Sequence, residues 1–259
     1  MATIGLNIED LHVYIFVFVR LAAIILFNPV FFRARIPAGA KTGLIMCLTI
    51  IIAPLVPSYS YDGSLIQFLV SIMGEFFIGF LLSFVFNVYY YMLMFAADVM
   101  DTQLGFSMAK TMDPLTNIQT ATMGSFFNIM FMLYFFATNS HLLLINMAVN
   151  TFDAIGAGAA YISYEGGCKF AIALFTSVFL LAVRLALPFV AAEFVLEVSL
   201  GLLMKLIPQI HVFVIQMQGK IFVGLTLLIA MLIPVSNFVS DYMEQMFKSA
   251  NDAIMSLVT

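Results

Sequence analysis

Charged residues are scarce in this sequence. Asp, Glu, Lys and Arg make up 9% of its 259 residues, whereas hydrophobic residues make up 63%. A soluble domain normally carries about 25% charged residues, so this composition excludes a water-soluble fold. Crossing a bilayer takes about 20 apolar residues, and four stretches lack charge over roughly that length or more: 42–61, 76–97, 114–152 and 221–240. The chain is therefore predicted to cross a membrane several times.

Cysteines and clustered cations are also few. Cys47 and Cys168 lie far apart in the sequence and form neither a metal-binding pair nor a disulfide framework. The net charge is −4, and basic residues cluster only at Arg33, Arg35 and Lys41. This pattern excludes a nucleic-acid-binding surface and indicates a cytoplasmic loop between two spans.

Catalytic motifs are missing as well. The three histidines are far apart, and the sequence contains no HExxH, no GxSxG serine and no glycine-rich phosphate loop. We therefore expect that the protein is not an enzyme and that it uses no metal or other cofactor.

What the sequence has in abundance is long apolar runs without period-two alternation, which favours helices over a membrane barrel. The predicted fold is all-α: a polytopic membrane protein of long, kinked helical hairpins. We expect helices at about 11–32, 42–56 and 64–97, with an interruption at Gly74-Glu75, two helices within 118–152, and a hairpin over 170–259 that ends in a span at 221–240 and an amphipathic helix. A Gly- and Ala-rich linker at 153–169 predicts two parts, 1–160 and 161–259.

Charged residues inside these apolar helices are candidate functional residues, because each needs a partner within protein. Arg20 is expected either to face a partner helix or the interface or to form a structural ion pair, and Glu75 needs a partner inside the protein. Arg184 lies four residues before the helix-bending Pro188. Four further residues recur every four positions and are expected on one helix face: Glu193, Glu197, Gly201 and Lys205. This stripe predicts either the wall of a water-filled path or a surface that packs against neighbouring subunits. The alternative is that the charges compensate each other within the helix.

Two polar segments interrupt the apolar pattern. The loop 98–119 has the composition of a gate, because a flexible glycine, a bulky aromatic and deformable thioethers follow one another; its candidate residues are Gly105, Phe106, Ser107, Met108 and Met112. The alternative is an ordinary polar connection. The second segment, 208–220, is predicted to be the turn of the final hairpin and contains Pro208, Gln209 and Lys220.

Several short motifs, taken in order and with their spacing, resemble the FliR family of the bacterial flagellar type III export gate and its injectisome relatives. They are Arg35-Ile36-Pro37 with Lys41 and Gly43; Gly74-Glu75 with Gly79; Gln103 to Phe106 followed by Asp113-Pro114; Asn139-Ser140-His141; and Leu187-Pro188 through Gly201, Pro208-Gln209 and Phe213. Ser140, His211 and Gln218 depart from the family pattern, which has Gly, Asn and Pro there.

The resemblance covers nearly the whole chain and implies a function. Residues 1–160 are similar in layout to FliP and 161–259 to FliQ, so the chain is expected to complete an export gate with FliP-like and FliQ-like subunits and an FlhB-like protein. The gate would pass unfolded flagellar proteins across the bacterial inner membrane at the flagellar basal body. By position, Gly105 to Met112 correspond to the plug of the gate and 208–220 to the tip of the hairpin.

An ion-coupled transporter of small solutes is the alternative function. Carboxylates within or beside spans often bind protons or sodium, and this chain has Glu75, Asp98, Asp101, Glu193 and Glu197 in such positions. Against this alternative, the sequence shows no pair of broken helices of the kind found in transporters with inverted repeats.

Overall fold

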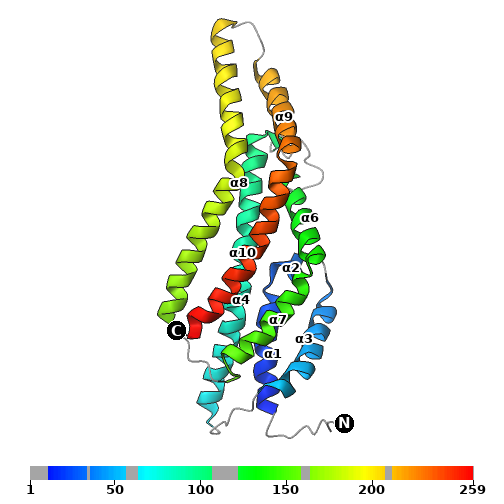
Figure 1. Cartoon of the computed structure of the whole chain (residues 1–259), viewed down its shortest axis with the longest axis vertical. Coiled ribbons are helices and arrows are strands. Elements are labelled where there is room, and N and C mark those ends of the chain that lie inside the picture. The colour runs from blue at the N-terminus through cyan, green and yellow to red at the C-terminus, as the bar shows by residue number, and fades with distance from the viewer. Residues whose placement is uncertain are drawn as a thin grey trace. The chain divides into compact units, whose positions relative to one another are not determined.

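The computed structural model describes residues 11–33, 36–56, 64–106, 122–158, 164–207 and 212–258. All elements in these ranges are helices, as Figure 1 shows. In chain order they are α1 (Leu11–Leu26), α2 (Pro29–Arg33), α3 (Ala38–Ile52), the 3-10 turn η2 (Ala53–Leu55), α4 (Leu65–Gln103), α6 (Thr122–Ala137), α7 (Ser140–Ala154), α8 (Tyr164–Leu206), α9 (Val212–Ala230) and α10 (Leu232–Val258).

Several helices are long and apolar enough to cross a membrane. The described residues contain three such stretches, Ala38–Leu55, Leu65–Gln103 and Glu165–Leu206, and two bent helix pairs would bring the number to five. The bent pairs are α6 with α7 and α9 with α10. These findings confirm the prediction of an all-α, polytopic membrane protein.

The chain forms two compact units, each assembled from separate segments. The first unit comprises Met1–Tyr89, Thr138–Phe175 and Gln245–Thr259, and the second comprises Tyr90–Ala137 and Thr176–Glu244. Helices α4, α8 and α10 each contribute to both units. The predicted boundary between 160 and 161 falls outside the described residues and stays a prediction; the two units do not follow it.

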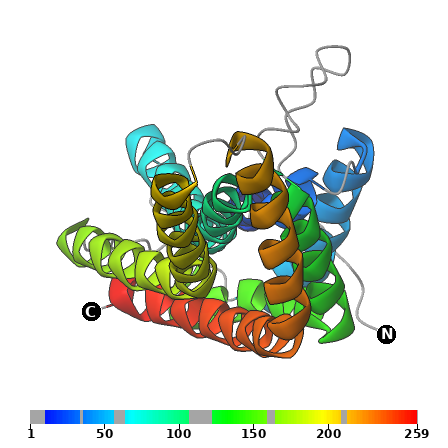
Figure 2. The same cartoon turned by 90° about the horizontal axis from the view of Figure 1, so that it is seen from above.

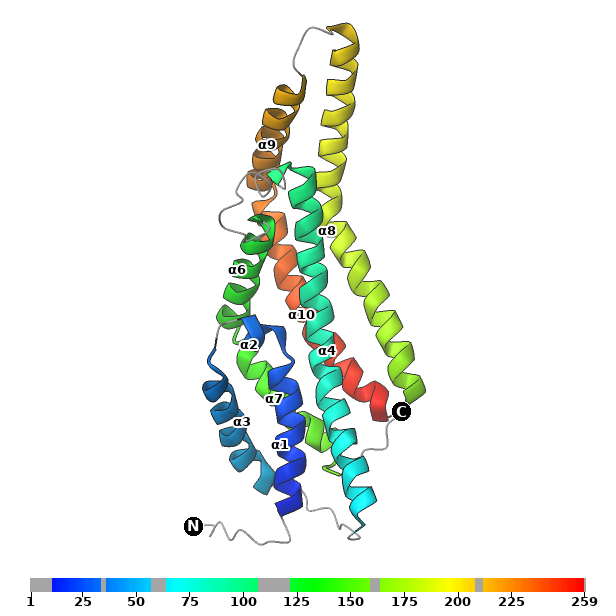
Figure 3. The same ribbon diagram turned by 180° about the vertical axis from the view of Figure 1, so that it is seen from behind.

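In the first unit, α1 packs directly against α4. A side chain at Gly79 would collide with the backbone carbonyl of Arg20 and come within 2.7 Å of the Ala23 methyl group, so this crossing needs glycine. The hydroxyl of Ser83 donates to the α1 carbonyls of Ala23 and Ile24, at 3.1 and 2.7 Å. Helix α3 lies beside α1 on its other side (Figures 1 and 3).

The second unit is assembled around the C-terminal part of α4. Helix α6 is joined to this part of α4 by a hydrogen bond, in which the Tyr90 hydroxyl of α4 donates to Asn128 Oδ1 of α6 at 2.8 Å. Helix α9 approaches the same part of α4 closely, because Gly224 leaves the space that the buried Leu104 side chain occupies. The first unit holds α10 through the pair Tyr89 and Ser249, whose hydroxyls lie 2.8 Å apart.

Five expected boundaries prove to be wrong. The helix expected at about 11–32 is two helices, because α1 ends at Leu26 and Pro29 begins α2. Gly74-Glu75 does not interrupt α4, which is continuous for 39 residues. The loop expected at 98–119 starts later, because 98–103 belong to α4. The turn expected at 208–220 is helical from Val212 onwards. The linker expected at 153–169 is shorter, since α7 continues to Ala154 and α8 begins at Tyr164.

The expected span 221–240 is also wrong, because it is two helices. Helix α9 ends at Ala230, and α10 begins at Leu232 with a bend of 63° that Figure 2 shows clearly. Pro234 explains the break: a proline lacks an N–H and its ring clashes with the carbonyl four residues earlier, which here belongs to Ala230. Towards its C-terminal end α10 buries Tyr242, Met243 and Met246 and exposes Asp241 and Glu244.

Candidate functional site

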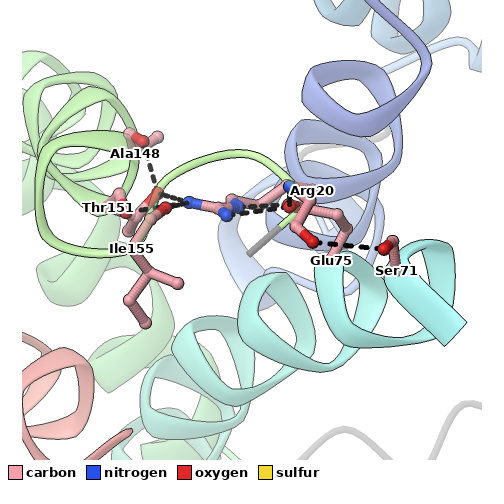
Figure 4. A network of polar contacts seen from close by, with 7 residues as sticks. Arg20, Ser71, Glu75, Ala148, Thr151 and Ile155 are labelled. Atoms are coloured by element: carbon pink, nitrogen blue, oxygen red, sulfur yellow. Dashed lines mark hydrogen bonds and ion pairs between the residues drawn. The ribbon is translucent and has the colours of Figure 1, made fainter. Parts of the chain in front are cut away.

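A buried ion pair in the first unit joins α1 to α4. Arg20 and Glu75 are both 0% exposed, with Arg20 Nε 2.5 Å from Glu75 Oε2 and Nη2 3.0 Å from Oε1. The remaining guanidinium nitrogen, Nη1, donates to the carbonyls of Thr151 and Ile155 at 2.8 and 3.0 Å. Figure 4 shows Arg20 reaching from α1 between Glu75 and the end of α7.

The same network continues on the side of Glu75. The backbone N–H of Gly158 donates to Glu75 Oε1 at 2.7 Å, and Gly158 takes a left-handed conformation with φ 78°. The Ser71 hydroxyl donates to the Gly158 carbonyl at 3.1 Å. Arg20 also stacks its guanidinium 4.1 Å from the centre of the Phe152 ring. Every guanidinium nitrogen is thus bonded, which is the condition for a buried charge to be tolerated.

Two residues expected to need partners inside the protein therefore find each other. The sequence indicated that Glu75 and Arg20 each required one, but nothing in it paired them, because they are 55 positions apart. For Arg20 the sequence indicated a structural ion pair or a position facing a partner helix or the interface, and the structure shows the ion pair. Its position in the middle of an apolar helix was the only available signal.

In the second unit, a charged cluster connects α8 with α9. Lys220 of α9 forms an ion pair with Glu197 of α8, and their side chains are 15% and 42% exposed. One turn earlier on α8, Glu193 is 0% exposed, and within the described part of the chain neither carboxylate oxygen has a hydrogen-bond partner. Gly219 fits against the Leu196 side chain at the same crossing.

The expected stripe on α8 does not lie on one face. An α-helix has 3.6 residues per turn, so each step of four residues rotates by about 40°. Over the three steps from Glu193 to Lys205, the direction changes by about 120°. Accordingly Glu193 is buried, whereas Glu197, Gly201 and Lys205 are exposed in the single chain. Lys220, expected in the hairpin turn, lies inside α9 and is the cation that pairs with Glu197.

The predicted gate begins where α4 ends. Gly105 has φ 74°, a left-handed conformation that favours glycine. A Cβ at this position would lie 3.8 Å from Lys220 Cβ and 3.9 Å from Lys220 Cδ, so the end of α4 packs along the stem of the Lys220 side chain. Phe106 is half-buried. Ser107, Met108 and Met112 lie outside the described residues.

One turn before Gly105, Asp101 connects α4 to the first described turn of α6. Its buried Oδ1 accepts a hydrogen bond from the backbone N–H of Met123 at 3.0 Å. An apolar pocket beside this contact is lined by residues of five helices: Met100, Met123, Phe126, Phe127, Phe189, Leu228, Leu232 and Val235. Asp101 therefore ties the C-terminal end of α4 to the start of α6.

The remaining predicted residues lie apart from these clusters. Arg184 is exposed in the single chain, as are its apolar neighbour Leu187 and, further along α8, Phe194. Pro208 and Gln209 fall outside the described residues. Among the described residues, no three His, Cys, Asp or Glu side chains are grouped so that they could hold a metal ion.

These features define an all-α membrane protein with a buried ion pair in one unit, a partly exposed charged cluster in the other, and extensive exposed apolar helix faces. A model of the family described as bacterial export proteins, family 1, matches residues 11–246. The chain belongs to this family.

Curated relatives agree with this assignment. The chain is similar to the flagellar biosynthetic protein FliR of Bacillus subtilis, with 28% identity over 83% of this chain and 84% of that protein. It is 26% identical to the FliR protein of Escherichia coli over 95% of this chain and 94% of the relative. The Yop proteins translocation protein T of Yersinia pestis is 25% identical over 73% of each.

Proposed function

We propose that this chain is a subunit of a flagellar type III protein export gate in the bacterial inner membrane. With FliP-like and FliQ-like subunits, and beside an FlhB-like protein, it forms the channel through which unfolded flagellar proteins leave the cytoplasm. The match to the export family over residues 11–246 carries this proposal. It is supported by the names of the relatives, which include flagellar biosynthetic protein FliR.

The surface of α8 supports a role inside an assembly. Arg184 is exposed, and so are the large apolar side chains of Leu187, Phe194 and Leu202 on the same helix. An arginine facing lipid from the middle of an apolar helix costs several kcal/mol, whereas the same arginine is tolerated when a neighbouring protein supplies an acceptor. A neighbouring subunit along α8 would cover both kinds of surface.

Affinity purification of the tagged full chain tests the assembly. We expect membrane proteins with the chemistry of export-gate subunits to co-purify, identified by mass spectrometry. Arg184→Leu should reduce their recovery, because it removes an exposed charge that forms no hydrogen bond or ion pair within the described part of the chain. Lys169→Leu is the matched control: Lys169 pairs with Glu165 at the start of α8, where both side chains are largely exposed. Unchanged recovery with Arg184→Leu would contradict this use of α8.

Within this function, Gly105 to Met112 are proposed to form the plug of the gate. The end of α4 supports the placement, since it is held by the Leu104 contact with Gly224 and by the Lys220 stem against Gly105. Deleting 105–112 should let small ions leak across the membrane while the co-purified subunits stay at their normal amounts. Membranes that remain tight at normal expression would refute the plug assignment.

The transporter alternative gains one observation from the structure. Among the described residues, α6 with α7 and α9 with α10 are both bent pairs with short breaks, and discontinuous helices are typical of transporter binding sites. Proteoliposomes that contain only this chain distinguish the two functions. Solute uptake that disappears with Glu197→Gln would support the transporter, and its absence would support the gate subunit.

A further inference from the structure

Two carboxylates in this chain share the same burial but have opposite surroundings. Glu75 and Glu193 are both 0% exposed. Glu75 accepts hydrogen bonds from two guanidinium nitrogens and a backbone N–H. Glu193, in the described part of the chain, accepts none at either oxygen. An ionised carboxylate needs such donors when water is excluded. Of these two glutamates, therefore, only Glu75 has surroundings that stabilise the ionised form.

The charged groups that act on Glu193 are Lys220, which attracts its negative charge, and Glu197, which repels it. Lys220 is already paired with Glu197. If Glu193 and Glu197 were both ionised beside the single ammonium group of Lys220, the cluster would have a net charge of −1. The excess negative charge would lie at the buried Glu193. Neutrality at this place requires one additional proton.

We infer that Glu193, Glu197 and Lys220 form a proton-binding site in which Glu193 holds the proton while Lys220 pairs with Glu197. The two carboxylates are one helical turn apart, about 6 Å along the axis, and a lysine side chain is long and flexible enough to serve either one. When Glu193 loses its proton, it becomes the buried anion that most needs a cation, and Lys220 turns from Glu197 towards it. Glu197, which is 42% exposed, then relies on water.

The Lys220 side chain also packs beside the residues that follow α4. The Cβ and Cδ atoms of Lys220 pack at 3.8 and 3.9 Å from the position of a Cβ at Gly105. The side chain that changes partner is therefore the one against which α4 ends. The proton-binding site itself follows from the geometry of the chain and does not depend on the proposed export function.

Infrared difference spectroscopy tests the site without relying on any transport assay. A neutral carboxylic acid has a carbonyl band that is separate from the bands of carboxylates and amides. The sample is the tagged full chain, purified together with its co-purifying subunits and kept in lipid at neutral pH. Circular dichroism and the amounts of the co-purified subunits verify that each variant is folded.

The expected pattern distinguishes a proton site from a buried structural glutamate. Subtracting the Glu193→Gln spectrum from the wild-type spectrum should reveal one neutral-acid band. The band should persist in Glu75→Gln, because Glu75 is paired with Arg20 and ionised, and in Lys220→Met, because no cation then replaces the proton on Glu193. It should disappear in Glu197→Gln, since Lys220 is then free to neutralise an ionised Glu193.

Two results would overturn the inference. Absence of the neutral-acid band from the wild-type chain at neutral pH would show that Glu193 is ionised and finds its cation elsewhere. Persistence of the band in Glu197→Gln would show that Lys220 does not exchange between the two carboxylates. Failure of the proposed function would give a different result. The band pattern would be as expected, but export-gate subunits would be missing from the purified material.

Discussion

Removing either member of the Arg20 and Glu75 pair should destabilise the first unit strongly. Glu75→Gln keeps the shape of the side chain but leaves the guanidinium of Arg20 buried without a counter-charge. Breaking a buried pair in this way costs about 3–5 kcal/mol, because the remaining charge stays desolvated. Arg20→Met leaves Glu75 with the Gly158 N–H as its donor and should cost about as much.

The double variant is the informative one. In Arg20→Met with Glu75→Gln no charge remains, and the principal loss is the hydrogen bond to the Ile155 carbonyl, since the Thr151 carbonyl still accepts from the Ile155 N–H. An unpaired buried polar group costs about 1–3 kcal/mol. The double variant should therefore be no less stable than either single variant, which corresponds to a coupling energy of about 3 kcal/mol or more.

Equilibrium unfolding of the full chain in mixed detergent micelles, followed by circular dichroism, measures these free energies. The pair Glu165 and Lys169 on α8 is the control, because it has the same charges but lies largely exposed. Its double-mutant cycle should give less than about 1 kcal/mol. Additive effects of the Arg20 and Glu75 substitutions would refute the reasoning, because they would mean that the two charges do not depend on each other.

Three further substitutions test contacts in the second unit by the same unfolding assay. Gly224→Ala should destabilise by about 1–3 kcal/mol, because its methyl group collides with Leu104, and combining it with Leu104→Ala should cost less than the two single effects summed. Gly105→Ala should cost about 1–2 kcal/mol at φ 74°, whereas Gly201→Ala, inside α8 with open space around it, should be neutral or slightly stabilising. Asp101→Leu should cost about 1–3 kcal/mol by leaving an N–H of α6 without its acceptor.

The all-α fold class and the membrane assignment could be predicted because they depend on hydrophobicity and its period along the sequence, which are similar in all the long apolar segments. Apolar runs without alternation leave helices as the way to satisfy the backbone in lipid. Boundaries were harder to predict, and the reasons lie in single residues. Pro234 in the sequence indicated the break after Ala230. The run 221–240, however, has no charged residue and is long enough for one membrane span, which favoured a single helix. Gly74 suggested a break in α4 that does not occur, and Gly79, a little further along, permits the close packing with α1.

The charge clusters could be predicted only in part, because the sequence shows which residues need partners but not which residues supply them. Arg20 and Glu75 meet through the packing of α1 on α4. Lys220 looked like a turn residue because polar neighbours surround it, yet it is helical and completes the Glu197 pair. The every-four spacing from Glu193 to Lys205 suggested one face, but the rotation of about 40° per step separates its two ends.

Helices α4 and α8 are much longer than a bilayer is thick. At about 1.5 Å per residue, 39 and 43 helical residues extend about 58 and 64 Å, roughly twice the hydrocarbon thickness of a bilayer. Fitting α8 into that thickness by tilting alone would need about 60°, beyond the range of about 0–40° that transmembrane helices adopt. Part of α8 therefore lies outside the hydrocarbon. Large apolar side chains are exposed along the whole helix, from Ile172 to Leu206, so whichever part lies outside carries apolar side chains that would face water unless other protein chains cover them. A lone carrier in lipid would not need such a helix, whereas a subunit enclosed by other subunits would.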